Sequence, residues 1–421
     1  MCYNVGYICR MGVGVVDVVR FDMERPPQRQ KTHLRVLTWL MSFPVVWLRR
    51  LKINRVNMKG LKPPYLLLCT HKSFIDFMVT TACTFPHRAN YVVAIDGFIG
   101  REKLLRNVGC ICKRKFTNDV QMVMHLKQVI DNGDILVIYP EARYSLIGTN
   151  ACLPSSLGKL ARMFKVPVVV LSMHGNFIYS PVWNLRKRNI RLEADLTQII
   201  TQDEIRQLSG GEINARIGKA FEYDEYMWQK NNSIRVRYKN RAKGLHKVLY
   251  ACQNCGTEYQ MESDGDRLWC GQCGSSWTMS QYGELFGEEG PVHIPHWYEA
   301  LREQVRAMIE AGTYAFSSDV VVDSLPNADG YIRLGEGRLT HDMTGFTLEG
   351  IFDGKPFVLK KDPLSMYSCH IEYDYIGKGD CIDLSTLSDT YYIYPKIKEW
   401  SATKISLAVE ELYRFVAGRN A

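Results

Sequence analysis

A histidine and an aspartate that could act together on a hydroxyl group stand in the segment THKSFID, as His71 and Asp76. His71 directly follows an apolar run at residues 65–70. Neutral imidazole can take a proton from a hydroxyl, while a carboxylate beside its other nitrogen fixes the tautomer and stabilises the imidazolium. The pair therefore predicts a general base. The alternative is a surface histidine beside an ordinary helix start.

Two further segments place charged side chains after buried strands. Residues 134–139 read DILVIY and lead into Glu141 and Arg143. Residues 109–113 read GCICK and run into a group of three cations, Lys113, Arg114 and Lys115. A guanidinium group binds phosphate oxygens through a two-pronged fork. These segments indicate an anion site at one edge of a sheet, and solvated turns are the alternative.

Four cysteines form two Cys-x2-Cys pairs with fourteen residues between them: Cys252, Cys255, Cys270 and Cys273. A glycine follows the second cysteine of each pair, where a tight turn lets backbone N–H groups donate to thiolate sulfur. This spacing predicts a tetrahedral zinc ribbon. Four protein ligands close the coordination shell, so the zinc would be structural. Unpaired or redox thiols are the alternative.

The elements that must position these residues follow from alternating apolar runs and helical segments. Strands are expected at residues 65–70, 90–95, 109–113, 134–139, 166–172 and 190–196. Helices are expected at residues 74–84, 101–107, 117–132, 155–164, 211–229 and 240–250. Strands and helices that alternate at this spacing predict an α/β domain with a largely parallel sheet, which we bound at residues 34–250.

The rest of the chain divides into smaller parts. Residues 1–33 are expected to form a loosely docked leader. The ribbon occupies residues 251–278. Residues 297–421 are predicted to be a small mainly-β domain, with short strands broken by Gly, Asp and Asn and a C-terminal helix at 402–417. Residues 34–51 are apolar and aromatic, so this segment lies either in a bilayer interface or on the protein's own core.

Charge and composition limit the classes of function. The chain has 421 residues and a net charge of +9, but residues 1–250 carry +21 and residues 251–421 carry −12. A basic half favours an anionic partner such as a membrane surface, a phosphorylated substrate or nucleic acid. No run approaches the ~20 apolar residues of a spanning helix, and no secretory signal is recognisable. The odd count of 13 cysteines indicates a reducing compartment.

The three charged segments together resemble the glycerolipid acyltransferase family that makes phosphatidic acid from lysophosphatidic acid. His71 and Asp76 match its His-x4-Asp motif, and residues 109–115 resemble its Gly-x-Ile-Phe-Ile-x-Arg motif. Residues 139–141 resemble the start of its Phe-Pro-Glu-Gly-Thr-Arg-Ser motif, and residues 166–169 resemble its apolar fourth motif. The resemblance covers residues 35–245. It departs from the family in the third motif, where Ala, Arg and Tyr replace Gly, Thr and Arg, and in the second, where Lys115 holds the Arg position.

The resemblance implies a direct acyl transfer from acyl-CoA or acyl carrier protein to a lysophospholipid acceptor, 1-acylglycerol-3-phosphate. His71 would deprotonate the acceptor hydroxyl and Asp76 would orient the imidazole. The acceptor phosphate would bind Lys113, Arg114, Lys115 and Arg143, while Glu141 would orient its glycerol hydroxyl. Residues from about 314 resemble a pleckstrin-homology-like or GRAM-like module, on pattern alone.

The implied location is peripheral, on the cytoplasmic face of the cell membrane. Anionic lipid would attract the basic half, and a set of apolar side chains would insert: Trp39, Leu40, Phe43, Val46 and Trp47. One competing hypothesis is a non-catalytic lipid- or protein-binding scaffold on the same fold, against which the intact His71–Asp76 pair argues. A nucleic-acid-binding protein is disfavoured, because the ribbon is acidic and no groove-reading element is recognisable.

Overall fold

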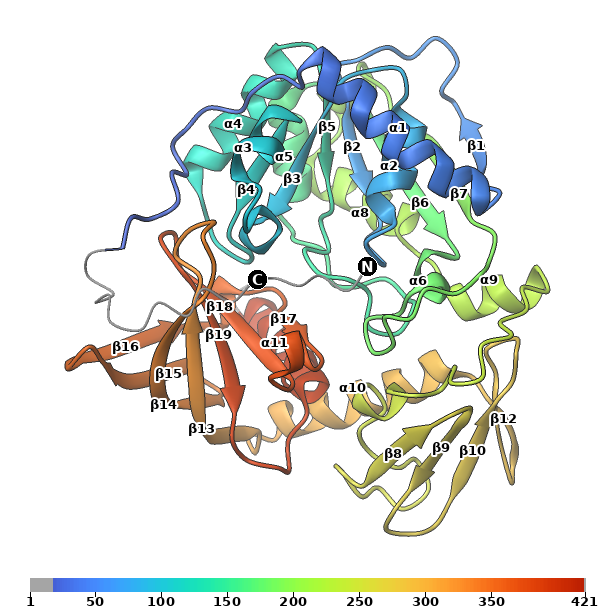
Figure 1. Ribbon diagram of the computed structural model, residues 1–421, viewed down its shortest axis with the longest axis vertical. Coiled ribbons are helices and arrows are strands. Elements are labelled where there is room, and N and C mark those ends of the chain that lie inside the picture. Colours follow the sequence, from blue (N-terminus) through green and yellow to red (C-terminus); the bar gives the residue numbers. More distant parts are fainter. Residues whose placement is uncertain (1–17, 420–421) are drawn as a thin grey trace.

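The computed structural model describes residues 18–419, which form three parts around two large sheets and one small one (Figure 1). An α/β domain comes first, a small sheet that carries the four cysteines follows, and a mainly-β region with a terminal helix ends the chain. The later two parts lie below the α/β domain in Figure 1, and helix α10 (Ile294–Glu310) runs between them.

The first sheet has seven strands in the order β1-β7-β6-β2-β5-β3-β4. The strands are β1 (Lys52–Val56), β2 (Leu66–Cys69), β3 (Ala89–Ala94), β4 (Cys110–Lys113), β5 (Ile135–Ile138), β6 (Val168–His174) and β7 (Glu193–Ile200). Strand β7 runs antiparallel to β6, and the other neighbouring strands are parallel, so the sheet is mixed rather than uniformly parallel.

Helices cover both faces of this sheet. They are α1 (Thr32–Leu48), α2 (Asp76–Thr84), α3 (Glu102–Asn107), α4 (Val120–Asp131), α5 (Leu157–Phe164), α6 (Asn176–Tyr179), α7 (Glu204–Gln207), α8 (Gly210–Ala220) and α9 (Glu225–Asn231). Alternate residues of β2 join different cores: Leu67 packs with the α2 side, while Leu66 and Leu68 pack with α4, α5 and α8. Burial on both faces explains why β2 is apolar throughout.

Several expectations need correction. Strand β1 was not predicted, because its sequence KINRV is half charged and polar and it is largely exposed at the sheet edge. The expected helix at 211–229 is two helices, α8 and α9, separated by a capped turn at Asp224. The expected helix at 240–250 is only a 3-10 turn at Leu245–Lys247.

Helix α1 presents one apolar side outward. Small side chains such as Thr38 and Ser42 face the protein, together with Val46. The opposite side exposes six large apolar residues, of which four are the most exposed: Leu40 (68%), Met41 (64%), Trp47 (69%) and Leu48 (72%). The expectation that Val46 inserts into lipid is therefore wrong. Within residues 18–419, no helix is long and apolar enough to cross a membrane.

The four-cysteine part is an antiparallel sheet in the order β12-β11-β10-β9-β8. Its strands are β8 (Met261–Asp264), β9 (Arg267–Cys270), β10 (Ser276–Met279), β11 (Leu285–Gly287) and β12 (Gly290–Val292). Trp277 of β10 packs on Trp297 of α10 with a centroid distance of 4.8 Å. This contact ties the small sheet to the helix that follows it.

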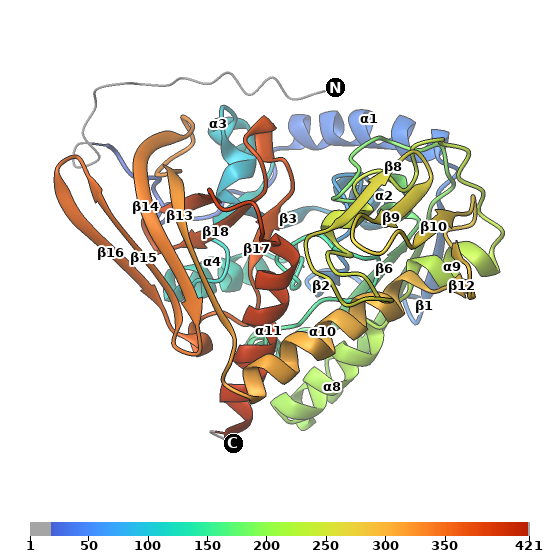
Figure 2. The ribbon, with the colours of Figure 1, turned by 90° about the horizontal axis from the view of Figure 1, so that it is seen from below.

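The mainly-β region contains seven antiparallel strands in the order β16-β15-β14-β13-β19-β18-β17. They are β13 (Ala315–Ser324), β14 (Ile332–Asp342), β15 (Gly345–Phe352), β16 (Lys355–Lys361), β17 (His370–Glu372), β18 (Cys381–Ser385) and β19 (Thr390–Pro395). Helix α11 (Ala402–Arg419) packs on β17 and α10 (Figure 2). The expected strands followed by one terminal helix are thus present. From here residues 294–419 are called the C-terminal region.

Residues 18–31, part of the expected leader, are docked rather than loose. Phe21 is buried and its N–H donates to the carbonyl of Pro326 (2.9 Å). Arg29 forms two hydrogen bonds of 2.8 Å to the Asp134 carboxylate, and Arg20 pairs with Asp389. This segment therefore straps the C-terminal region to the α/β domain. Residues 1–17, the remainder of the leader prediction, lie outside the described residues.

Candidate active site

The loop after β2 brings His71 and Asp76 into contact. The Nδ1 atom of His71 lies 3.1 Å from Oδ2 of Asp76. Asp76 is buried, whereas the His71 side chain keeps 23% of its surface exposed. When Nδ1 carries the proton and donates to the carboxylate, Nε2 keeps the lone pair that can accept a proton from a hydroxyl. The geometry therefore fits a general base with an orienting carboxylate.

Asp76 is held on every side. Its Oδ2 accepts from the main-chain N–H groups of Lys72 (2.6 Å) and Ser73 (3.0 Å), and its Oδ1 accepts from the side-chain amide of Asn176 (2.7 Å). Asp76 is also the first residue of α2, where the helix dipole favours a negative charge. These contacts fix the carboxylate against which His71 is aligned.

Two tyrosines flank the imidazole. Tyr139 and Tyr144 have ring centroids 4.4 Å and 4.3 Å from that of His71. The Tyr139 hydroxyl is 3.0 Å from the hydroxyl of Thr80. Tyr144 occupies the position where the resembled motif has arginine, so this chain places an aromatic ring rather than a cation beside the base. Ala142, at the motif's Gly position, adopts a left-handed φ of 54°.

Glu141 serves the protein's own main chain. Its Oε2 accepts from the N–H of His71 (2.7 Å), and its Oε1 accepts from the N–H of Ala151 (2.8 Å) and the Tyr223 hydroxyl (3.2 Å). Burial raises the pKa of Glu141 against the opposing effect of the hydrogen bonds from Ala151 and His71. The structure thus places Glu141 as a support for His71, with both oxygens engaged.

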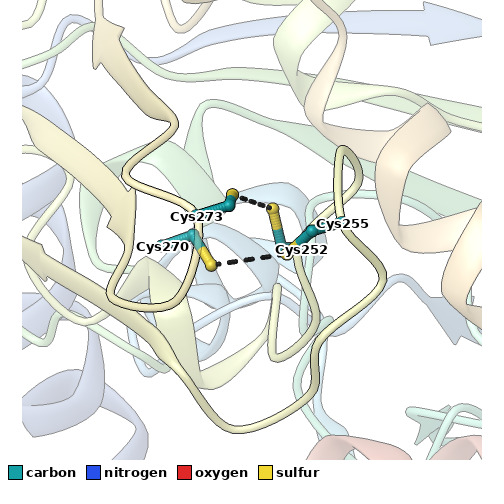
Figure 3. Close-up of side chains that lie close together, drawn as sticks. All are labelled: Cys252, Cys255, Cys270 and Cys273. Atoms are coloured by element: carbon teal, nitrogen blue, oxygen red, sulfur yellow. Dashed lines mark hydrogen bonds between the residues drawn. The ribbon is translucent and has the colours of Figure 1, made fainter.

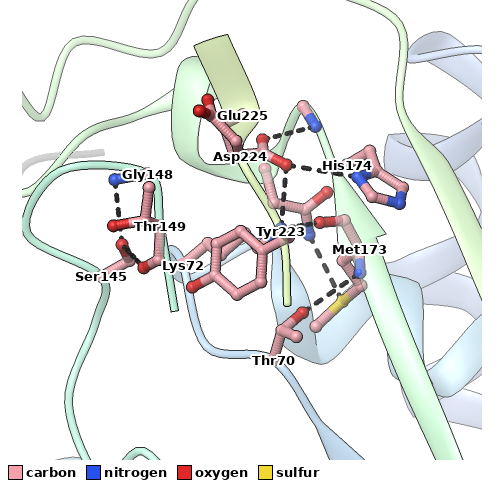
Figure 4. A network of polar contacts seen from close by, with 12 residues as sticks. Thr70, Lys72, Ser145, Gly148, Thr149, Met173, His174, Tyr223, Asp224 and Glu225 are labelled. Carbon is pink, nitrogen blue, oxygen red and sulfur yellow. Dashed lines mark hydrogen bonds and ion pairs between the residues drawn. The ribbon is translucent and has the colours of Figure 1, made fainter. Parts of the chain in front are cut away.

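A buried charge network includes Lys72, the residue that follows His71 in the chain (Figure 4). Lys72 Nζ is 2.8 Å from Oε1 of Glu225, donates to the carbonyl of Met173 and lies 3.6 Å from the centre of the Tyr223 ring. Glu225 Oε2 accepts from the N–H of Gly175 (2.7 Å). Glu225 therefore ties the His71 loop to the start of α6, and both segments hold Asp76.

His174 extends this network toward the surface. Its Nδ1 is 3.5 Å from Glu225 Oε1, and its Nε2 is 3.2 Å from Asp195 Oδ2. Burial would lower the pKa of His174, but hydrogen bonds with Asp195 and Glu225 outweigh burial and raise it. The sequence analysis missed this network, because Glu225 lies 153 residues from Lys72 and no local spacing connects them.

The cations expected to bind phosphate contact other parts of the protein. Arg114 is buried and donates to the carbonyls of Leu325 (2.9 Å) and Pro326 (2.8 Å) and to the Thr390 hydroxyl (3.0 Å). Lys113, which is half-buried, donates to the carbonyl of Thr117 (3.1 Å). Arg114 thus helps to attach the C-terminal region.

Lys115 and Arg143 form ion pairs with carboxylates of that region. Lys115 Nζ is 3.4 Å from Asp383 Oδ2 and 3.3 Å from Asp96 Oδ2. Burial would lower the pKa of Lys115, but these two carboxylates outweigh burial and raise it. Arg143 Nη2 lies 2.7 Å from Oε1 of Glu410. The structure therefore places both cations just after the C-terminal ends of β4 and β5, and there each is paired with a carboxylate of the C-terminal region.

The four cysteines converge at one end of the small sheet (Figure 3). The sulfur atoms of Cys252, Cys255, Cys270 and Cys273 all lie within 4.8 Å of one another. In each pair, the N–H of the residue after the second cysteine donates to the carbonyl of the first, from Gly256 to Cys252 (2.9 Å) and from Gly274 to Cys270 (3.0 Å). Hydrogen bonding with Ser275 lowers the pKa of Cys273 to about 6, which favours thiolate. The cluster could hold a metal such as zinc.

One comparison with known proteins covers part of the first domain. Residues 49–174, which include His71, Asp76, Glu141 and Arg143, match the family model described as Acyltransferase. No curated protein matches the chain. Among solved structures, the chain is similar to the crystal structure of the 1-acyl-sn-glycerophosphate (LPA) acyltransferase PlsC from Thermotoga maritima. That likeness has 12% sequence identity and a TM-score of 0.38, and covers 45% of this chain and 77% of that one. Residues 49–174 thus belong to an acyltransferase-like α/β domain, to which the chain adds a four-cysteine cluster and a mainly-β C-terminal region.

Proposed function

We propose that this protein transfers a fatty acyl group from an acyl thioester to the hydroxyl of a lysophospholipid, with 1-acylglycerol-3-phosphate as acceptor and phosphatidic acid as product. The observation that carries the proposal is the 3.1 Å contact between His71 and a buried Asp76, at a strand end within the segment that matches the acyltransferase family. Acyl-CoA or acyl carrier protein would supply the thioester.

The proposed reaction needs no acyl-enzyme intermediate. Nε2 of His71 takes the proton of the acceptor hydroxyl while the hydroxyl oxygen attacks the thioester carbonyl carbon. The C–S bond breaks as the new C–O ester bond forms, and the imidazolium returns the proton to the thiolate that leaves. Asp76 stabilises the imidazolium between these steps, a task for which its fixed position suits it. Proton transfer by a positioned base contributes about 10²–10⁴ in rate.

We further propose that helix α1 binds the protein to the cytoplasmic leaflet of the cell membrane. Its outward apolar side, around Leu40 and Trp47, fits insertion into an interface. Three cations follow the helix in the sequence, Arg49, Arg50 and Lys52, of which Lys52 also pairs with Glu193 (3.2 Å). Such cations contribute about 1 kcal/mol each near an anionic surface. The acceptor would then reach His71 from the bilayer.

The four-cysteine cluster is proposed to bind one structural zinc ion. Zinc prefers four thiolates in a tetrahedron, and sulfur atoms within 4.8 Å of one another fit that geometry. Two similar turns supply the ligands, each with one pair of cysteines, and none of the residues proposed for acyl transfer comes from this part of the chain.

A non-catalytic scaffold is the second candidate, and one observation favours it. Lys115 and Arg143, which would bind the acceptor phosphate, are paired with Asp383 and Glu410. A protein that only binds lipid or another protein would have no need of free cations beside His71.

Acyl transfer by the purified full chain decides between these functions. The protein is incubated with a labelled acyl thioester and a panel of lysophospholipids and glycerol phosphates, and products are identified by mass. We expect acylated lysophosphatidic acid from wild type, at least about 10²-fold less from His71→Ala, and wild-type amounts from a control at an exposed histidine, His87→Ala. Absence of product from wild type with every acceptor would reject the enzyme and favour the scaffold.

A further inference from the structure

The loops that follow β4 and β5 send two cations to one short segment of the C-terminal region. Arg143 Nε donates to the hydroxyl of Ser368 (3.2 Å), and Lys115 Nζ lies 3.1 Å from Nε2 of His370. Residues two apart in an extended chain are separated by only about 7 Å. Both cations therefore contact residues 368–370, and Arg143 directly precedes Tyr144, whose ring contacts His71.

We propose that Glu410 and Asp383 of the C-terminal region compete with the phosphate of the acceptor for Arg143 and Lys115, so that this region sets the affinity of the acyltransferase domain for phosphorylated acceptors. The inference rests on the proposed function, because it takes these two cations as the phosphate ligands. It adds that carboxylates of the C-terminal region occupy the place of the phosphate when no acceptor is bound.

The Glu410 carboxylate is arranged so that Arg143 can leave it. Its Oε1 accepts from Arg143 (2.7 Å) and from the Ser368 hydroxyl (2.7 Å), while its Oε2 accepts from Arg302 of α10 (2.8 Å). Arg302 belongs to the same region as Glu410. Departure of Arg143 would therefore not leave an unpaired buried carboxylate, which is the main cost of breaking a buried ion pair.

Asp383 has the same arrangement. Its Oδ2 lies 2.6 Å from Nδ1 of His370, within the C-terminal region, and 3.4 Å from Nζ of Lys115. Asp383 is thus closer to His370, in its own region, than to Lys115. Lys115 in turn keeps Asp96 of the α/β domain as a partner at 3.3 Å.

A phosphomonoester can outcompete these carboxylates for a chemical reason. It carries close to two negative charges and three acceptor oxygens, so it can engage both cations at once, whereas each carboxylate holds only one. The balance between the two states is set by the difference in the strength of their charge-assisted hydrogen bonds.

Equilibrium binding of glycerol 3-phosphate to the full chain tests the competition without turnover. We expect Glu410→Gln to bind this probe about tenfold more tightly than wild type, because a neutral amide competes less well for Arg143. The matched control is Glu411→Gln: Glu411 is the neighbouring buried carboxylate and pairs with Arg302, Arg306 and Arg414. The Glu411→Gln protein should bind glycerol 3-phosphate as tightly as wild type does. Adding Arg143→Gln to Glu410→Gln should remove the gain.

Asp383→Asn is a second variant that should also bind glycerol 3-phosphate more tightly than wild type. It replaces Glu410→Gln in the test if that variant does not fold. Kinetics with vesicles that contain lysophosphatidic acid should show a lower KM and an unchanged kcat, whereas monoacylglycerol, which lacks phosphate, should show no change in KM. Equal or weaker glycerol 3-phosphate binding by both variants, or an equal gain in Glu411→Gln, overturns the competition. Tighter binding in a protein that transfers no acyl group would keep the competition and reject the proposed enzyme instead.

Discussion

Lys72 and Glu225 form an ion pair in which both side chains are fully buried, one residue after the proposed base in the chain. Breaking such a pair by removing one partner costs about 3–5 kcal/mol, since the other charge stays buried without its counterion. We expect Lys72→Met and Glu225→Gln each to destabilise the protein by this amount. The double variant should lose clearly less than the sum. Urea denaturation of the four proteins measures this coupling, and strictly additive losses would contradict it.

The His71–Asp76 pair should control the chemical step. His71→Ala should lower kcat by about 10²–10⁴, and Asp76→Asn should also be severe, because an amide neither fixes the tautomer nor stabilises the imidazolium. Thermal unfolding should show that His71→Ala remains folded, since the His71 side chain is partly exposed. Full activity in a folded His71→Ala protein would rule out the proposed mechanism.

The cysteine cluster should bind one zinc ion per chain. Metal analysis of protein purified under reducing conditions should give this stoichiometry. The Cys255→Ser protein should contain less zinc per chain and have a lower melting temperature. The matched control is Cys152→Ser, at a half-buried cysteine outside the cluster. Stoichiometric zinc in the Cys255→Ser protein would contradict the assignment.

Helix α1 should bind membranes through its outward side. Replacing Leu40 and Trp47 by Ser should reduce flotation with anionic liposomes, and flotation of wild type should weaken with salt, because screening is strong beyond ~8 Å at physiological ionic strength. The control replaces two equally exposed apolar residues of the C-terminal region, Ile351 and Val358. Equal loss of flotation in both pairs would argue against a specific role for α1.

Trp39 is expected to behave differently from Trp47. Its ring packs against Phe85, with centroids 4.7 Å apart, and Arg35 lies over it at 5.1 Å. Trp39→Ser should therefore lower the stability of the fold more than membrane binding. A Trp39→Ser variant with unchanged melting temperature and no flotation would reverse this assignment.

Acid should weaken the attachment of the C-terminal region. Burial alone would raise the pKa of Glu410, but Arg143 and Arg302 outweigh burial and lower it to about 2, from an ordinary value of 4.5. A carboxylate with a depressed folded-state pKa stabilises the fold above its unfolded pKa, and this contribution is lost as pH falls from about 4.5 toward about 2. Unfolding free energy measured over this range should fall less steeply in Glu410→Gln than in wild type.

The sequence was sufficient for the elements whose signal is local. Leu66–Cys69 and Ile135–Ile138 are apolar runs followed by polar loops, and both form central strands. The Cys-x2-Cys pairs likewise carry their turn chemistry within a few residues. Edge strand β1 lacked such a signal, because half of its surface faces solvent and its pairing partner β7 lies about 140 residues later.

The parts of the site that escaped prediction depend on contacts between distant segments. Whether a cation such as Arg143 is free or paired depends on Glu410, 267 residues away. Spacing within a motif carries no information on that partner. The same applies to Glu141, whose acidity suggested a substrate ligand, while its hydrogen bonds to His71 and Ala151 show that it supports the main chain.

The strap formed by residues 18–31 has a consequence for biosynthesis. The Phe21 N–H donates to the Pro326 carbonyl and Arg20 pairs with Asp389, so the first residues of this segment find partners in the last quarter of the chain. During synthesis from the N-terminus these partners do not yet exist, and the early α/β domain must wait with its cationic loops uncovered. A nascent chain stalled before Pro326 should therefore be more sensitive to proteases, and more dependent on chaperones, than one released at full length.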